Sequence, residues 1–138
     1  MIAGGVISLK MHFPRPLVSG MLAIALTSIW NLSIGLSLTL PIILLTAFVA
    51  GIAIEIFGVV WMTSLQRHIP EESYSRVVSY DTLGSYALAP IGIALAGPVA
   101  EWIGTSPTLI ATAGITLLAA LLPLTLKSVR ELKNQPKE

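Results

Sequence analysis

Residues 61–81 read WMTSLQRHIPEESYSRVVSYD, and this polar stretch decides the fold because a long apolar segment flanks it on each side. The preceding segment, 41–65, is almost uninterrupted, and the following one covers 83–103. Pro70 disfavours helical geometry at Ile69, so the first helix should end near that residue. Both segments are long enough to cross a lipid bilayer. The stretch therefore predicts a transmembrane helical hairpin.

The composition of the chain points to the same class of protein. The 138 residues are 54% hydrophobic and 11% charged, with a mean hydropathy of +0.84. Soluble domains carry about 25% charged residues, so this chain is predicted to be an integral membrane protein in contact with a lipid bilayer. A net charge of +1 gives no reason to expect a nucleic-acid partner. The absence of cysteine excludes disulfides and thiolate metal sites.

Four segments are long and apolar enough to cross the hydrocarbon core, which takes about 20 helical residues. They are 17–36, 41–65, 83–103 and 108–126. Ser106 and Pro107 are predicted to begin the last span, as its N-cap and first helical residue. We interpret 1–9 as the tail of a truncated helix and 127–138 as a polar cytoplasmic tail. The predicted fold is an all-α, polytopic transmembrane helix bundle that forms one membrane domain, with four full spans and one remnant.

The basic residues determine the predicted orientation. All eight lysines and arginines fall in three segments, which contain Lys10 and Arg15, then Arg67 and Arg76, then Lys127, Arg130, Lys133 and Lys137. The short loops near 37–40 and 104–106 contain none. By the positive-inside rule, the three basic segments and the C-terminus are expected on the cytoplasmic side.

Small or polar residues recur at helical spacing in every span. These stripes are Gly20, Ala23, Thr27, Asn31 and Gly35; Ala47, Gly51, Glu55, Gly58 and Met62; Ser85, Ala89, Gly92, Ala96 and Ala100; and Thr112, Thr116 and Ala119. Small side chains let helices approach closely in lipid, so we expect the spans to pack as a bundle. The predicted helix-packing residues are Gly51, Gly58, Gly92, Gly97 and Pro98.

The hairpin sequence resembles the loop between helices ten and eleven of a major facilitator superfamily transporter. The resemblance is carried by W-x-T-x-L-Q-R-x-I-P-E-E at 61–72 and by S-R-V-x-S-x-D at 75–81. The sequence APIGIALAGPVAEWIG at 89–104 is similar to helix eleven of the family, especially of its bacterial drug-efflux-like members. The resemblance implies that the four spans are the last four of twelve helices in a bacterial inner membrane. The N-terminal half would then be a missing partner.

The resemblance also implies a function. Such proteins are secondary-active transporters that work by alternating access, and we expect an exporter of small molecules or drugs, coupled to protons. We expect no cofactor, no metal and no enzymatic activity. Two alternatives stay open, namely a four-helix transporter that acts as a dimer around Glu55 and a membrane scaffold that transports nothing.

Glu55 is the strongest candidate for a functional residue. It lies near the middle of its span, where an ionised carboxylate costs about 2.5 kcal/mol or more on insertion scales. Because it belongs to the small-residue stripe, it should face other helices or a wet cavity, and the resemblance implies that its helix lines the central cavity. The candidate roles are proton coupling and contact with a cationic substrate. The alternative is a packing carboxyl, with Asn31 as its candidate partner.

Three charged residues of the hairpin are candidates for a cytoplasmic gate. They are Arg76, Asp81 and Arg67, because the resemblance implies that charges in this loop tie helix ends together, and switching proteins make and break such ties. The alternative for the two arginines is ordinary charge at the membrane surface that holds the topology. Trp61 is expected to pack or to anchor the helix and not to bind a ligand.

Overall fold

The structure of this chain is a computed structural model that describes residues 15–131, and helices joined by short turns make up all of that part. The elements are α2 (Pro16–Gly35), α3 (Leu40–His68), α4 (Glu71–Ile103), α5 (Thr105–Leu121), the 3₁₀ turn η1 (Leu122–Thr125) and α6 (Lys127–Glu131). Four of these helical segments are long and apolar enough to cross a membrane, counting α5 with η1 as one. The predicted all-α fold with four spans is therefore confirmed. The predicted helix remnant at 1–9 lies outside the described residues.

The hairpin turn is shorter than the polar stretch that predicted it. Helix α3 ends at His68 as expected, and Ile69 takes extended backbone angles before Pro70. Helix α4 then begins at once, at Glu71, and continues for 33 residues with Pro90 and Pro98 inside it. The two glutamates of its first turn favour an early start, since acidic side chains stabilise a helix N-terminus. The predicted span 83–103 is thus the later part of a longer helix.

The turn between α4 and α5 corrects the prediction that Ser106 caps the last span. Gly104 has φ 96° and ψ 153°, a conformation that residues with a side chain rarely adopt. Its N–H donates to the carbonyl oxygen of Ala100 (3.0 Å), and its own carbonyl oxygen accepts from the N–H of Thr108 (3.2 Å). One glycine therefore ends α4 and caps α5, which begins two residues earlier than predicted, at Thr105.

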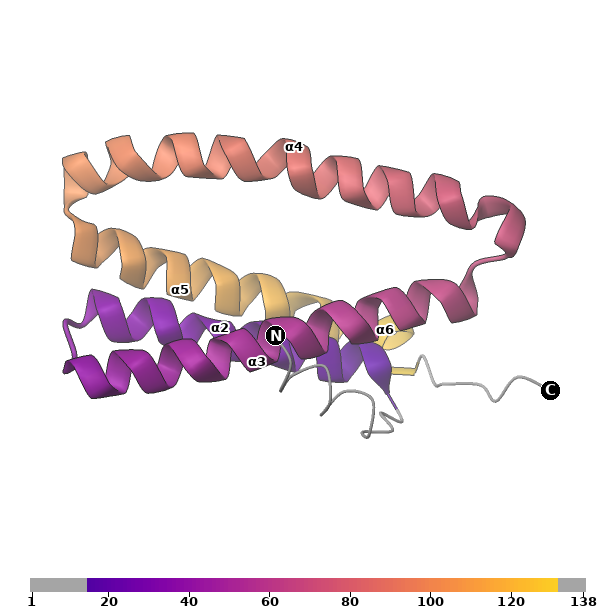
Figure 1. The fold of residues 1–138 in the computed structure, drawn as a ribbon, viewed down its shortest axis with the longest axis horizontal. Helices are drawn as coiled ribbons and strands as arrows, with labels where there is room; N and C mark the ends of the chain where they lie inside the picture. Colours follow the sequence, from indigo (N-terminus) through magenta and orange to yellow (C-terminus); the bar gives the residue numbers. More distant parts are fainter. Residues whose placement is uncertain (1–14, 132–138) are drawn as a thin grey trace.

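Helix α2 is the centre of the packed part of the molecule. Figure 1 shows α2 between α3 and α5. Helix α4 lies apart from these three helices and connects the C-terminal end of α3 to the N-terminal end of α5. The hydrophobic side chains buried among these three helices are small, namely Ala23, Ala25, Ala50, Ala53, Ala113 and Ala120, with Val60 as the largest. This is the composition expected where helices approach closely in lipid.

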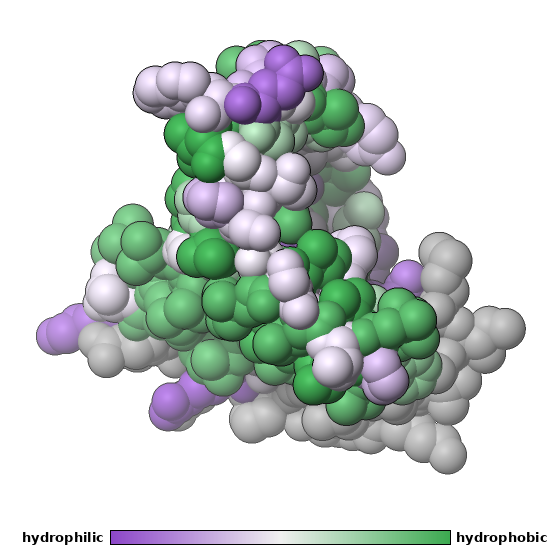
Figure 2. All heavy atoms as spheres, turned by 90° about the vertical axis from the view of Figure 1, so that its left-hand side faces the viewer, coloured by the Kyte–Doolittle hydropathy of each residue, from purple (hydrophilic) through white to green (hydrophobic). Residues whose placement is uncertain are grey.

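Helix α4 and much of the outer surface carry apolar side chains that no other described residue covers. No residue of α4 is buried. The view in Figure 2, onto the end where α4 meets α5, shows a hydrophobic surface over its lower part and more polar residues toward the top. Such a surface suits contact with lipid or with further helices and not with water.

Candidate functional site

Helix α3 has two faces that carry small residues, and only one of them packs against α2. The packed face buries Ala50, Ala53, Val60 and Ser64. The other face is an open groove of about 470 Å³. Its lining residues all belong to α3 and are Ile54, Glu55, Gly58, Val59, Met62, Thr63 and Gln66. The predicted stripe around Glu55 therefore lies beside, and not within, the contact between α2 and α3.

This groove combines one acidic group with uncharged polar groups and apolar walls. Glu55 is the only acidic residue of α3, and its side chain is partly buried. Thr63 and Gln66 follow on the same side of the helix and offer hydrogen-bond donors and acceptors. Asn31, the candidate partner of Glu55, is partly buried on α2, and no hydrogen bond joins the two side chains in the described part of the chain. The groove can hold a proton or a cation on one carboxylate beside an apolar surface.

The glycines predicted to pack do not contact neighbouring helices in residues 15–131. A Cβ atom added at Gly51, Gly58, Gly92 or Gly97 would meet no atom within 4 Å. Pro98 is exposed on α4. Their role in helix packing stays a prediction, and it requires helices other than those described. The close approaches occur instead at Gly20 and Gly35 of α2.

The hairpin brings together one predicted gate residue and one residue that the sequence did not single out for function. The indole Nε1–H of Trp61 on α3 donates to Oδ2 of Asp81 on α4, at 3.1 Å. Arg67 and Arg76, the other gate candidates, are exposed. Trp61 lies eight residues before Ile69 and Asp81 lies eleven residues after Pro70, so spacing from the turn alone did not indicate that the two side chains would meet.

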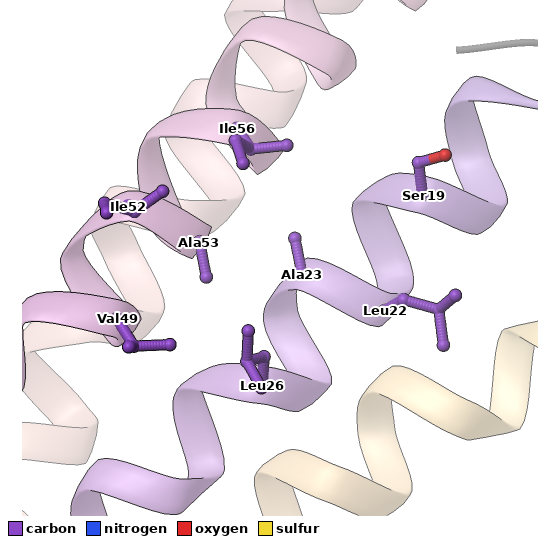
Figure 3. Close-up of a pocket in the computed structure, with 8 residues that line it drawn as sticks. All are labelled: Ser19, Leu22, Ala23, Leu26, Val49, Ile52, Ala53 and Ile56. Atoms are coloured by element: carbon purple, nitrogen blue, oxygen red, sulfur yellow. The ribbon is translucent and has the colours of Figure 1, made fainter. Parts of the chain in front are cut away.

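A second, apolar groove of about 290 Å³ lies between α2 and α3. Figure 3 shows Ala23 of α2 and Ala53 of α3 pointing toward one another across it. Its one polar side chain is Ser19, whose hydroxyl already donates to the carbonyl oxygen of Arg15 at 3.2 Å. This groove offers no group for proton or ion chemistry, so the Glu55 groove is the better candidate site.

Comparison with known proteins gives one match. The model of the family described as Major Facilitator Superfamily matches residues 1–138, which is the whole chain. No curated protein and no solved structure matches. Among residues 15–131, no group of three or more histidine, aspartate or glutamate side chains is placed to hold a metal ion.

Proposed function

We propose that this chain, which belongs to the Major Facilitator Superfamily, supplies the last four helices of a secondary-active exporter of small molecules in a bacterial inner membrane. The family and the four apolar helices make the chain part of a multi-pass membrane transporter. The direction of transport, the proton coupling and the cytoplasmic position of the hairpin and C-terminus belong to the proposal. They are supported by the resemblance to drug-efflux-like members and by the distribution of basic residues.

The observation that carries the proposal is the uncovered face of α3 around Glu55. A carboxylate facing lipid at this depth would cost about 2.5 kcal/mol or more, so such groups face a cavity or a partner. Helix α2 does not cover this face, because it packs on Ala50, Ala53 and Val60 instead. The Glu55 groove is therefore best explained as one wall of a polar cavity that further helices complete.

The uncovered surface of α4 supports the same arrangement. Membrane helices associate through close van der Waals contact, and small residues on α4 such as Gly92 and Gly97 would allow it. Neither glycine has a neighbour within reach of a Cβ atom in the described residues. We propose that an N-terminal half of the transporter contacts this helix. Four helices with two open faces do not enclose a substrate site on their own.

The proposed mechanism assigns one role to each part of the chain. Glu55 binds a proton when the cavity opens to one side of the membrane and releases it on the other, as the two halves alternate. The solute occupies the same groove, with Thr63 and Gln66 as hydrogen-bonding groups. Asp81, with Arg67 and Arg76, closes the cytoplasmic end. The solute is moved and not converted, so no cofactor is needed.

The substitution Glu55→Gln tests this proposal. Glutamine keeps the size and hydrogen bonding of the side chain but cannot carry the transported proton. We expect it to abolish export of ethidium driven by a pH gradient in vesicles that contain the complete transporter. Glu101→Gln is the matched control, because Glu101 is an exposed acid on α4 outside the groove. Expression and thermal stability should stay near wild type for both variants.

Two results would contradict parts of the proposal. Normal export by Glu55→Gln across the pH range would mean that Glu55 is a packing residue and not the coupling group. Saturable flux by the purified 138-residue chain alone would instead favour the dimeric four-helix transporter. A membrane scaffold would show neither flux nor any effect of Glu55→Gln.

A further inference from the structure

Helix α4 is held to the rest of the molecule by very few contacts near the hairpin. It buries no side chain, so packing of its apolar face does not fix its position relative to α3. Two side-chain hydrogen bonds join α3 and α4 in residues 15–131. One is the bond from Trp61 to Asp81, and the other runs from the Tyr74 hydroxyl to the sulfur of Met62. The separation of the two helices near the hairpin therefore depends on these bonds and on the turn at 69–70, while Gly104 joins the other end of α4 to α5.

The two hydrogen bonds are of unequal quality. The distance of 3.1 Å from Trp61 Nε1 to Asp81 Oδ2 is within the normal range, and both side chains are partly buried. A bond to a carboxylate is charge-assisted and stronger than one between neutral groups. The bond from Tyr74 to Met62 is exposed, is 3.9 Å long and ends on a thioether, which is a weak acceptor. The Trp61–Asp81 bond is thus the main tie between α3 and α4.

The indole ring of Trp61 is itself held in place by α2. Trp61 stacks on Phe57, one turn earlier on α3, with ring centroids 5.9 Å apart and an angle of 20° between the planes. Phe57 lies against Gly20 of α2, since a Cβ added at Gly20 would be 3.4 Å from its ring. A continuous set of contacts therefore runs from α2 through Phe57 and Trp61 to Asp81 on α4.

We propose that Trp61 is a positioning residue, which holds Asp81 and with it the hairpin end of α4 against the α2–α3 pair. When the indole bond is made, the opening between α3 and α4 is fixed. When it is lost, the hairpin end of α4 separates from α3, because no buried side chain resists the movement there, while Gly104 keeps the other end of α4 joined to α5. This inference concerns the geometry of the hairpin and stands whether or not Glu55 couples export to protons.

The test measures the distance between α3 and α4 near the Trp61–Asp81 bond. The chain has no native cysteine, so Ile54→Cys and Leu83→Cys label two chosen sites, which are 52% and 66% exposed in the wild-type chain. Both sites lie within about two helical turns of the bonded pair, at 3.6 residues per turn, so separation of the hairpin end changes the distance between them. Spin labels at both sites give the distance distribution in phosphatidylcholine nanodiscs.

The variants separate the hydrogen bond from the bulk of the side chains. Trp61→Phe keeps an aromatic ring on Phe57 but removes the N–H donor, and Asp81→Ala removes the acceptor. Both should shift the distances to longer values and broaden them. Asp81→Asn retains an acceptor oxygen but loses the charge, so it should open the hairpin less than Asp81→Ala does. Tyr74→Phe removes the weaker bond and is the matched control, expected to change little.

The double variant tests whether the two residues act as one unit. Trp61→Phe combined with Asp81→Ala should open the hairpin no further than either change alone, because both remove the same bond. Any one of three results would overturn the proposal. Asp81→Ala could leave the distance distribution unchanged, or the double variant could open the hairpin by the sum of the two single effects. Asp81→Asn could also open the hairpin as far as Asp81→Ala does. Thermal melting shows whether each variant is folded. If Trp61→Phe is not folded, the comparison of Asp81→Ala with Asp81→Asn still tests the proposal.

Discussion

Replacing Gly35 with alanine is expected to disrupt the contact between α2 and α5, because no space exists for the added methyl group. A Cβ atom at Gly35 would lie 2.9 Å from Cγ1 of Ile110, 3.1 Å from the backbone nitrogen of Ile110 and 3.1 Å from the carbonyl oxygen of Ser106. Ordinary van der Waals contact for such an atom begins at 3.4 Å. Two of these three atoms belong to the backbone of α5, so rotation of a side chain cannot relieve the clash.

The size of the effect follows from two opposing contributions. Forcing an extra methyl group into a packed contact costs about 1–3 kcal/mol. Alanine is more stable than glycine within a helix by about 0.5–1 kcal/mol, and less of this gain applies at Gly35 because it is the last residue of α2. Since backbone atoms must move, packing dominates, and we expect a net loss of about 1–2 kcal/mol in unfolding free energy.

The measurement is reversible unfolding of the full chain in mixed detergent micelles, followed by far-ultraviolet circular dichroism. Gly51→Ala is the matched control, because it adds the same methyl group within α3 where a Cβ atom meets nothing within 4 Å. The control should be neutral or slightly stabilising. If Gly35→Ala is no less stable than Gly51→Ala, then α2 and α5 do not approach each other as closely as the structure shows, and the reasoning is refuted.

Two more predictions concern topology and the contact between α2 and α3. Cysteines placed at Ser37 and at Thr105 should react with membrane-impermeant thiol reagents from outside intact cells, and a cysteine at Ser73 should not react. Labelling at Ser73 would overturn the orientation predicted from the basic residues. Ser33→Ala removes a 2.8 Å hydrogen bond to a hydroxyl of α3 and should lower the unfolding free energy by about 0.6 kcal/mol, the average for such bonds between membrane helices. Ser28→Ala is its control, since that hydroxyl bonds only within α2 at 2.7 Å, and equal losses in both variants would mean that the cross-helix bond contributes nothing.

The candidate site could be found from the sequence only in part. Glu55 stands out because an acidic residue in the middle of an apolar span is rare and costly, and this can be seen without knowing which helices pack around it. The pairing of Trp61 with Asp81 was not predicted, because it depends on the rotation of two helices about their own axes. Arg67 and Arg76 illustrate the same limit, since charge alone did not distinguish these exposed residues from the partly buried Asp81.

The sequence by itself determined the membrane class, the number of spans and the place where α3 ends. These features depend on local properties, namely the length of apolar runs and the restriction that Pro70 imposes on Ile69. They do not require knowledge of any neighbouring helix. The family, too, could be recognised from the hairpin and the segment that follows it.

Only the tertiary structure decided which face of each helix is covered. Helix α3 carries two sets of small residues. One set is Ala50 and Ala53, the other is Gly51 and Gly58, and a helical period of 3.6 residues fits either set. The structure buries the first set against α2 and leaves the second uncovered, with Gly58 in the open groove beside Glu55. The reason is physical, since periodicity defines a stripe on one helix, whereas a contact depends on how two stripes fit together in space.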